Sequence, residues 1–150
     1  MNSSERIYVC APLKGGNPTV ENITLNIRRA HALMCALLRQ GYNVFCPHTM
    51  WGGAYGVLPE NTFLALCLNW LYSCTTVALP GLTEPGGNML PELGLAATLG
   101  KRIMYWDDDT QRLADLPKGW LDKVLGTGQS QSNGAASNPN PKYPPVGVQP

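Results

Sequence analysis

The 150-residue chain has few charged residues, and their signs nearly balance. Asp, Glu, Lys and Arg make up 14% of the sequence, below the usual quarter, and the formal net charge is +1. A protein that coats nucleic acid normally shows a basic patch or stripe, so we expect no nucleic acid polymer as a partner. The balance is compatible with a small phosphate-bearing ligand, because such a ligand needs only a few local donors.

Long apolar runs and paired cysteines are also missing. No run approaches the roughly 18 apolar residues of a membrane span, and the first residues lack the basic start and apolar stretch of a signal peptide. The cysteines include no CxxC pair and all lie within apolar runs, so we interpret them as reduced core residues. These absences predict a cytoplasmic protein with no membrane partner. The five cysteines are Cys10, Cys35, Cys46, Cys67 and Cys74.

The first third of the chain predicts a strand, a helix and a second strand. Short β-branched apolar runs indicate buried strands, and apolar residues spaced by three and four indicate the helix between them. Such a unit is parallel and right-handed. In order, we expect a strand over Ile7–Ala11, a loop rich in Gly and Pro over Pro12–Pro18, a helix that begins at Thr19 or Glu21 and stops at Gly41, and a strand over Tyr42–Cys46.

The following part predicts a second unit of the same kind. The elements expected are a loop over His48–Pro59, a helix from Asn61 or Thr62 to about Tyr72, strands over Thr75–Leu79 and Arg102–Tyr105, a helix over Leu90–Leu99 between them, and an amphipathic piece within Asp107–Gly126 that Pro117 interrupts. Together these elements predict an α/β fold, a three-layer flavodoxin- or Rossmann-like sandwich with four or five parallel strands.

The composition changes at Thr127. Residues 127–150 contain five prolines, a single charged residue and almost no large apolar side chain. Such a segment cannot bury enough surface to offset the entropy of ordering it. We therefore expect one domain over residues 1–126 and a disordered tail over 127–150.

A ligand site is expected where two loops rich in glycine meet. Open parallel sheets bind ligands beyond the carboxyl ends of their strands, where the strand order reverses. In the flavodoxin-like order the first and third strands flank that point, and the loops that leave them are Pro12–Pro18 and Gly81–Met89. Glycines there let the backbone approach a ligand closely, although the same glycines also suit plain tight turns.

Glu92 lies in the first turn of the helix after the second of these loops. A carboxylate near a sugar C1′ can act as a nucleophile or stabilise an oxocarbenium-like transition state. The alternative is that Glu92 only stabilises the helix dipole. Nearby, Lys14 could meet a phosphate, Trp51 and Tyr55 could stack on a base, and His48 could join the site or brace its loop by a hydrogen bond.

Three segments resemble the nucleoside 2-deoxyribosyltransferase-like superfamily, especially its small phage and bacterial members, which are related to deoxynucleoside monophosphate N-glycosidases. They are IYVCAPLKGG (Ile7–Gly16), ENITLNIRRAHALMCALLRQGYNVFCPHT (Glu21–Thr49) and GGNMLPELGLAATLGKRIMYW (Gly86–Trp106). The resemblance implies that Glu92 is the catalytic nucleophile, that the Gly86–Asn88 turn contacts sugar or phosphate, and that the first loop lines the pocket. It also implies a homodimer and no cofactor.

The chain departs from the family pattern in Ala65–Thr76, which contains none of the acids usual there. Glu84, His48 or Asp107 could substitute for the missing group. The departure favours an alternative function, a non-catalytic protein that senses or sequesters a nucleotide; a scaffold that recruits a partner through the tail is a third reading. We expect no metal site at Asp107–Asp109, which is typical of a solvated turn. The candidate substrate-binding residues are Pro12, Leu13, Lys14, Gly15, Gly16, His48, Trp51, Gly86, Gly87 and Asn88.

Overall fold

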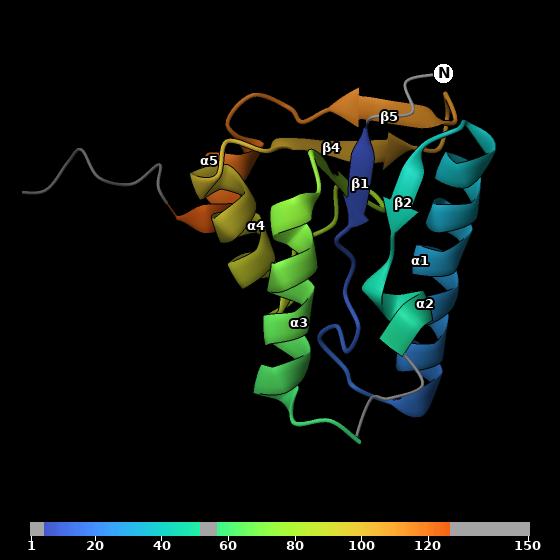
Figure 1. The fold of residues 1–150 in the computed structure, drawn as a ribbon, viewed down its shortest axis with the longest axis vertical. Coiled ribbons are helices and arrows are strands. Elements are labelled where there is room, and N and C mark those ends of the chain that lie inside the picture. Colours follow the sequence, from blue (N-terminus) through green and yellow to red (C-terminus); the bar gives the residue numbers. More distant parts are fainter. Residues whose placement is uncertain (1–4, 52–56, 127–150) are drawn as a thin grey trace, which may run out of the picture.

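The described residues form an α/β fold built on a five-stranded, mostly parallel sheet (Figure 1). The computed structural model describes residues 5–51 and 57–126, so the predicted tail and Tyr55 lie outside the described part. The elements are β1 (Arg6–Val9), α1 (Val20–Arg39), β2 (Asn43–Phe45), α2 (Pro47–Trp51), α3 (Glu60–Ser73), β3 (Thr76–Leu79), α4 (Met89–Thr98), β4 (Arg102–Asp107), β5 (Arg112–Asp115) and α5 (Trp120–Leu125).

The strands lie in the order β2-β1-β3-β4-β5. The first four strands are parallel, with Tyr8 of β1 opposite Phe45 of β2 and Val77 of β3. The expectation that the first and third strands are neighbours is therefore confirmed. Since the chain leaves the sheet at the carboxyl ends of both β1 and β3, their loops emerge side by side at the point where the strand order reverses.

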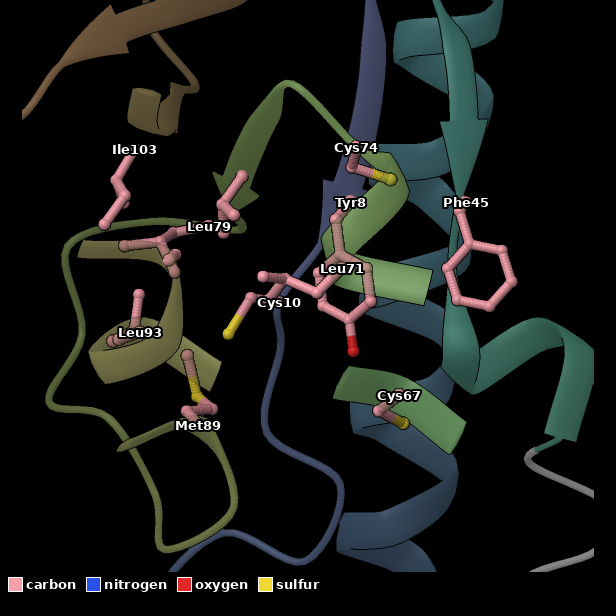
Figure 2. Packing of buried hydrophobic residues seen from close by; sticks show 12 residues of the cluster. Tyr8, Cys10, Phe45, Cys67, Leu71, Cys74, Leu79, Met89, Leu93 and Ile103 are labelled. Carbon is pink, nitrogen blue, oxygen red and sulfur yellow. The ribbon is translucent and has the colours of Figure 1, made fainter. Parts of the chain in front are cut away.

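Alternation along β1 separates the two faces of the sheet. Tyr8 and Cys10 pack with residues of α3 and α4, such as Leu71 and Leu93, whereas Ile7 and Val9 pack on the opposite side. Figure 2 shows Tyr8, Cys10, Met89 and Leu93 within one buried cluster. The face with Ile7 and Val9 is covered by α1 through its buried side chains (Ala30, Leu33 and Leu37). The period-two geometry of a strand thus assigns Tyr8 and Cys10 to the side where α4 begins.

The helix α1 matches its expected limits. Thr19 is the N-cap, and its hydroxyl accepts a hydrogen bond of 3.2 Å from the backbone N–H of Asn22. Gly41 follows the last turn with a φ of 85°, the left-handed conformation that favours glycine at this position. The helix α3 begins at Glu60, one or two residues before the expected start, with Pro59 as its N-cap.

A short helix, α2, replaces the first part of the expected loop over His48–Pro59. Proline fits the first position of a helix, because its φ is already helical and its missing N–H is not needed there. Pro47 takes this position, and the carbonyl of Cys46 accepts bonds from the backbone N–H groups of Thr49 and Met50. His48 consequently lies on a helix rather than in an open turn.

The segment after β4 also differs from the expectation, because it contains an antiparallel strand. Residues 112–115 form β5, which pairs with β4 so that Leu113 lies opposite Trp106. A tight turn reverses the chain: Asp107 accepts bonds from the N–H of Asp109 and the hydroxyl of Thr110, and Gln111 has a φ of 54°. The sheet therefore has four parallel strands and one antiparallel edge strand. None of the helices in residues 5–51 and 57–126 is both long and apolar enough to cross a bilayer.

Candidate functional site

Glu92 is a buried carboxylate held by two donors from β1. The side chain lies in the first turn of α4 with 7% of its surface exposed. The hydroxyl of Tyr8 donates to its Oε1 at 2.7 Å, and the thiol of Cys10, next to the end of β1, donates to its Oε2 at 3.0 Å. Glu92 is therefore buried behind the Gly-rich turn rather than exposed at the helix start, and each of its oxygens has a hydrogen-bond donor.

Burial sets the proton affinity of this group. Loss of solvation raises the pKa of Glu92 to about 6, against the opposing effect of the bonds from Cys10 and Tyr8. Burial, together with the nearby Glu92 charge, raises the pKa of Tyr8 and of Cys10 well above their usual values, so both stay protonated donors at neutral pH. At pH 7 Glu92 is mostly ionised, and it can take up a proton close to neutrality.

Two adjoining cavities lie beside Glu92. The inner one, of about 20 Å³, is lined by Glu92, His48 and Cys67 among others. The outer one, of about 180 Å³, lies between the first loop and the Gly-rich turn before α4. Leu13 and Asn88 line both cavities. The two cavities are therefore neighbours, and Glu92 lines the smaller of them.

The structure brings most of the predicted binding residues together. The first loop and the turn touch closely, because a Cβ added at Gly86 would lie 3.8 Å from the Cβ of Pro12 and 3.9 Å from the Cα of Gly15. Gly15 has a φ of 63°, a left-handed backbone conformation that favours glycine. Gly16 lines neither cavity, and the side chain of Trp51 lies outside the described part. The predicted residues that line the outer cavity are Pro12, Leu13, Lys14, Gly15, Gly86, Gly87 and Asn88.

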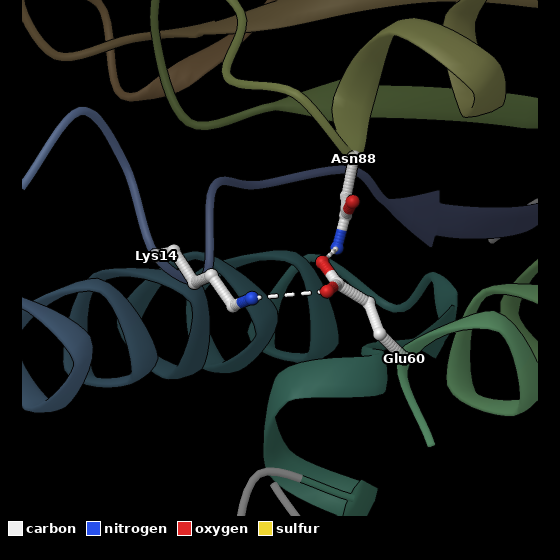
Figure 3. A network of polar contacts seen from close by, with 3 residues as sticks. All are labelled: Lys14, Glu60 and Asn88. Atoms are coloured by element: carbon white, nitrogen blue, oxygen red, sulfur yellow. Dashed lines mark hydrogen bonds and ion pairs between the residues drawn. The ribbon is translucent and has the colours of Figure 1, made fainter. Parts of the chain in front are cut away.

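Glu60, which is not among the predicted site residues, links these two loops. Its Oε2 lies 3.1 Å from Nζ of Lys14, and its Oε1 accepts a 3.3 Å bond from the amide of Asn88 (Figure 3). The hydrogen bonds from Lys14 and Asn88 lower the pKa of Glu60, and the bond from Lys14 has the larger effect. The place of Glu60 in the first turn after Pro59 is a local signal, because an acidic side chain is favoured at a helix N-terminus. Which loop that acid faces depends on the tertiary fold.

His48 shares the inner cavity with Glu92. Burial lowers the pKa of His48, against a smaller opposing effect of the Pro12 and Ala11 backbone. By strict geometry neither ring nitrogen makes a hydrogen bond with the described residues, although the backbone of Pro12 and Ala11 lies near enough to act on the ring. The imidazole is neutral at pH 7, because burial lowers a pKa that is ordinarily already below 7.

The other two candidates for a second acid lie away from Glu92. Glu84 lines a different hollow, of about 390 Å³, beside Trp120 of α5. Asp107 is engaged in the turn between β4 and β5, where the bonds from Thr110 and Asp109 lower its pKa. Of the three groups that could replace the missing acid, His48 is therefore the one that lines a cavity with Glu92.

A larger groove, of about 550 Å³, runs between α1 and the ends of β1, β3 and β4. Arg29, Trp106 and Asp108 line it, but Glu92, His48 and the Gly86–Asn88 turn do not. Volume by itself supplies no chemistry, whereas the smaller cavities combine a buried acid, an imidazole and two approaching loops. We therefore take the two cavities beside Glu92 as the candidate reactive site.

The last feature of the site is the arrangement of side chains that could bind a metal ion. Within the described ranges, no group of three or more His, Cys, Asp or Glu side chains is arranged to hold a metal ion. In the Asp107–Asp109 run, the carboxylate of Asp107 accepts hydrogen bonds from its own turn, namely from the N–H of Asp109 and the hydroxyl of Thr110.

No protein-family model matches the chain, and no curated protein matches it either.

Proposed function

We propose that the protein breaks the N-glycosidic bond of a nucleoside or nucleotide, as a deoxyribosyltransferase or an N-glycosidase. The observation that carries the proposal is Glu92, an ionisable carboxylate buried beneath a cavity and held by Tyr8 and Cys10. The resemblance of three segments to the nucleoside 2-deoxyribosyltransferase-like superfamily supports it. A three-layer, flavodoxin-like arrangement belongs to the same proposal, with α1 on one face of the sheet and α3, α4 and α5 on the other.

In the proposed reaction an oxygen of Glu92 attacks C1′ of the sugar. The new bond joins this oxygen to C1′, the N-glycosidic bond breaks, and its electron pair leaves with the base. Attack on C1′ by water or by a second base then releases the carboxylate, giving hydrolysis or transfer. Tyr8 and Cys10 fix the carboxylate, while each oxygen keeps a lone pair for the reaction. His48, which lines the inner cavity, donates a hydrogen bond from its neutral N–H to the departing base, and the proton released when water or the second base attacks C1′ ends on that departing base.

Base release from a panel of deoxynucleosides and their 5′-monophosphates tests this proposal. Glu92→Gln keeps the shape of the side chain but removes the nucleophile, so we expect base release to fall at least about a hundredfold. Chromatography of the free base measures the rate. Glu84→Gln is the matched control, because it changes an exposed glutamate that lines a different hollow. Equal rates for wild type and Glu92→Gln would show that the assignment of the nucleophile is wrong.

A second candidate function is a non-catalytic nucleotide-binding protein. It is favoured by α3, which presents Cys67 and Leu71 to the cluster around Tyr8 and has no acid in Ala65–Thr76. A thermal-shift assay with the same panel distinguishes the two functions. A ligand that raises the melting temperature, with no base released at any enzyme concentration, supports the binder.

A further inference from the structure

We infer that Glu60 makes the outer cavity select an unphosphorylated nucleoside over its 5′-monophosphate. This inference rests on the proposed function, since it names the substrate class of that site. Lys14, Glu60 and Asn88 come from three separate segments, namely the first loop, the start of α3 and the turn before α4. Their contacts place one carboxylate between the two loops that should hold the substrate (Figure 3).

The first step of the argument is the charge of the cavity. Lys14 is the cation of its lining and Glu60 is the anion, and the other lining residues carry no charge. The ammonium of Lys14 and the carboxylate of Glu60 are 3.1 Å apart, so they neutralise each other at the cavity. A phosphate entering here would meet a neutral pair rather than a free cation. It would also approach Glu92, a second carboxylate in the adjoining cavity.

The second step concerns the donors. A phosphate is normally held by an ammonium group, side-chain amides and backbone N–H groups at a helix N-terminus. Here the ammonium of Lys14 and the amide of Asn88, which precedes α4, both donate to Glu60. The carboxylate thus takes the place that a phosphate would need, and a phosphate must displace it or lie against its negative charge.

The third step concerns what the same carboxylate offers to a neutral sugar. Each carboxylate oxygen has two acceptor sites, and one partner on each oxygen leaves another site for a hydroxyl donor. The hydroxyl groups of a deoxyribose are such donors, and they carry no charge. The group that disfavours a phosphate therefore favours an unmodified 5′ end.

A pair of charge changes tests the inference. The ratio of kcat/KM for deoxyadenosine 5′-monophosphate to that for deoxyadenosine should be below one in the wild type. Glu60→Gln should raise this ratio about fivefold, the scale of an exposed ion pair, and added salt should shrink the gain. Lys14→Gln leaves Glu60 unneutralised, so it should lower the ratio. Glu84→Gln, outside the cavity, should leave it unchanged.

Binding constants for the same two ligands, measured by calorimetry, give the ratio without turnover. A wild type that prefers the monophosphate, or a Glu60→Gln variant with an unchanged ratio, would overturn the inference while leaving the proposed function intact. If neither ligand, nor any other member of the panel, binds or reacts with the wild type, the proposed function fails and the inference falls with it. Unchanged melting temperatures of the variants confirm that each still folds.

Discussion

At the scale of single residues, the hydroxyl of Tyr8 lowers the proton affinity of Glu92, which burial raises. This hydroxyl donates to the carboxylate at 2.7 Å, and this bond lowers the pKa of Glu92 against the larger effect of burial. Tyr8→Phe removes the donor but keeps the ring that stacks on Phe45 at a centroid distance of 5.8 Å. We therefore expect the pKa of Glu92 to rise above about 6, so that the acid limb of the pH–rate profile moves to higher pH.

The pH dependence of kcat/KM checks this prediction, and a carbon NMR titration of the glutamate carboxyl groups checks it without turnover. Tyr72→Phe is the control, because Tyr72 lies on α3 with 57% of its surface exposed. An acid limb at the same pH in wild type and Tyr8→Phe would contradict the role given to the hydroxyl.

The place of Glu92 at the start of a helix could be predicted from local sequence, but its partners could not. Glu92 follows a Gly-rich turn at the start of a helix, and both of these signals are local. Tyr8 and Cys10 lie in an apolar strand, where their polar tips are easily taken for core. Only the sheet topology shows that both face α4. Glu60 is 46 residues from Lys14 along the chain, so that contact carries no local signal at all.

At the scale of elements, α1 is stabilised at its N-terminus by the Thr19 cap. Thr19→Ala removes the acceptor of the 3.2 Å bond from the N–H of Asn22. Loss of such a cap costs about 1 kcal/mol of the free energy of unfolding, which urea denaturation measures. Thr24→Ala on the same helix is the control: its hydroxyl bonds back to the Val20 carbonyl, and alanine is the better helix former, so we expect no loss. Equal losses in both variants would speak against a capping role.

The elements that were predicted correctly have strong local signals, and those that were missed do not. The helix α1 combines a cap, an apolar stripe and a terminal glycine. By contrast, α2 has only five residues, too few for a helical period, and β5 begins and ends on charged residues, unlike the apolar runs that mark β1 and β3. The strand β5 also depends on pairing with β4, so an amphipathic pattern alone could not distinguish it from a helix.

At the scale of the whole molecule, two consecutive strand–helix–strand units allow more than one doubly wound strand order, and the flavodoxin-like order is the one that makes the first and third strands neighbours. The order β2-β1-β3-β4-β5 places the loops after β1 and β3 together, as expected. The interior of the site could not be predicted in the same way. Burial of Glu92 depends on how α3, α4 and β1 pack together, and that packing also makes the charge of Glu92 a cost to the folded state.

This cost predicts how global stability depends on pH. The folded-state pKa of Glu92 rises from the ordinary value of 4.5 to about 6, so between these pH values the folded protein binds more protons than the unfolded chain. The contribution of Glu92 is fully present below pH 4.5 and is lost as the pH rises through about 6. The loss amounts to about 2 kcal/mol. Glu60 and Asp107, whose pKa values are lowered, act in the opposite direction at lower pH.

Glu92→Gln isolates this contribution, because glutamine is neutral at every pH. Near pH 4 the free energies of unfolding of wild type and variant should be similar, since Glu92 is then protonated. Near pH 8 the variant should be more stable by up to about 2 kcal/mol, because it no longer buries a charge. Urea denaturation across this range measures the gap, and Glu84→Gln should show no gap that grows with pH. A gap that stays constant from pH 4 to 8 would mean that the buried carboxylate does not titrate with folding, and the assignment of Glu92 as a group poised near neutral pH would fail with it.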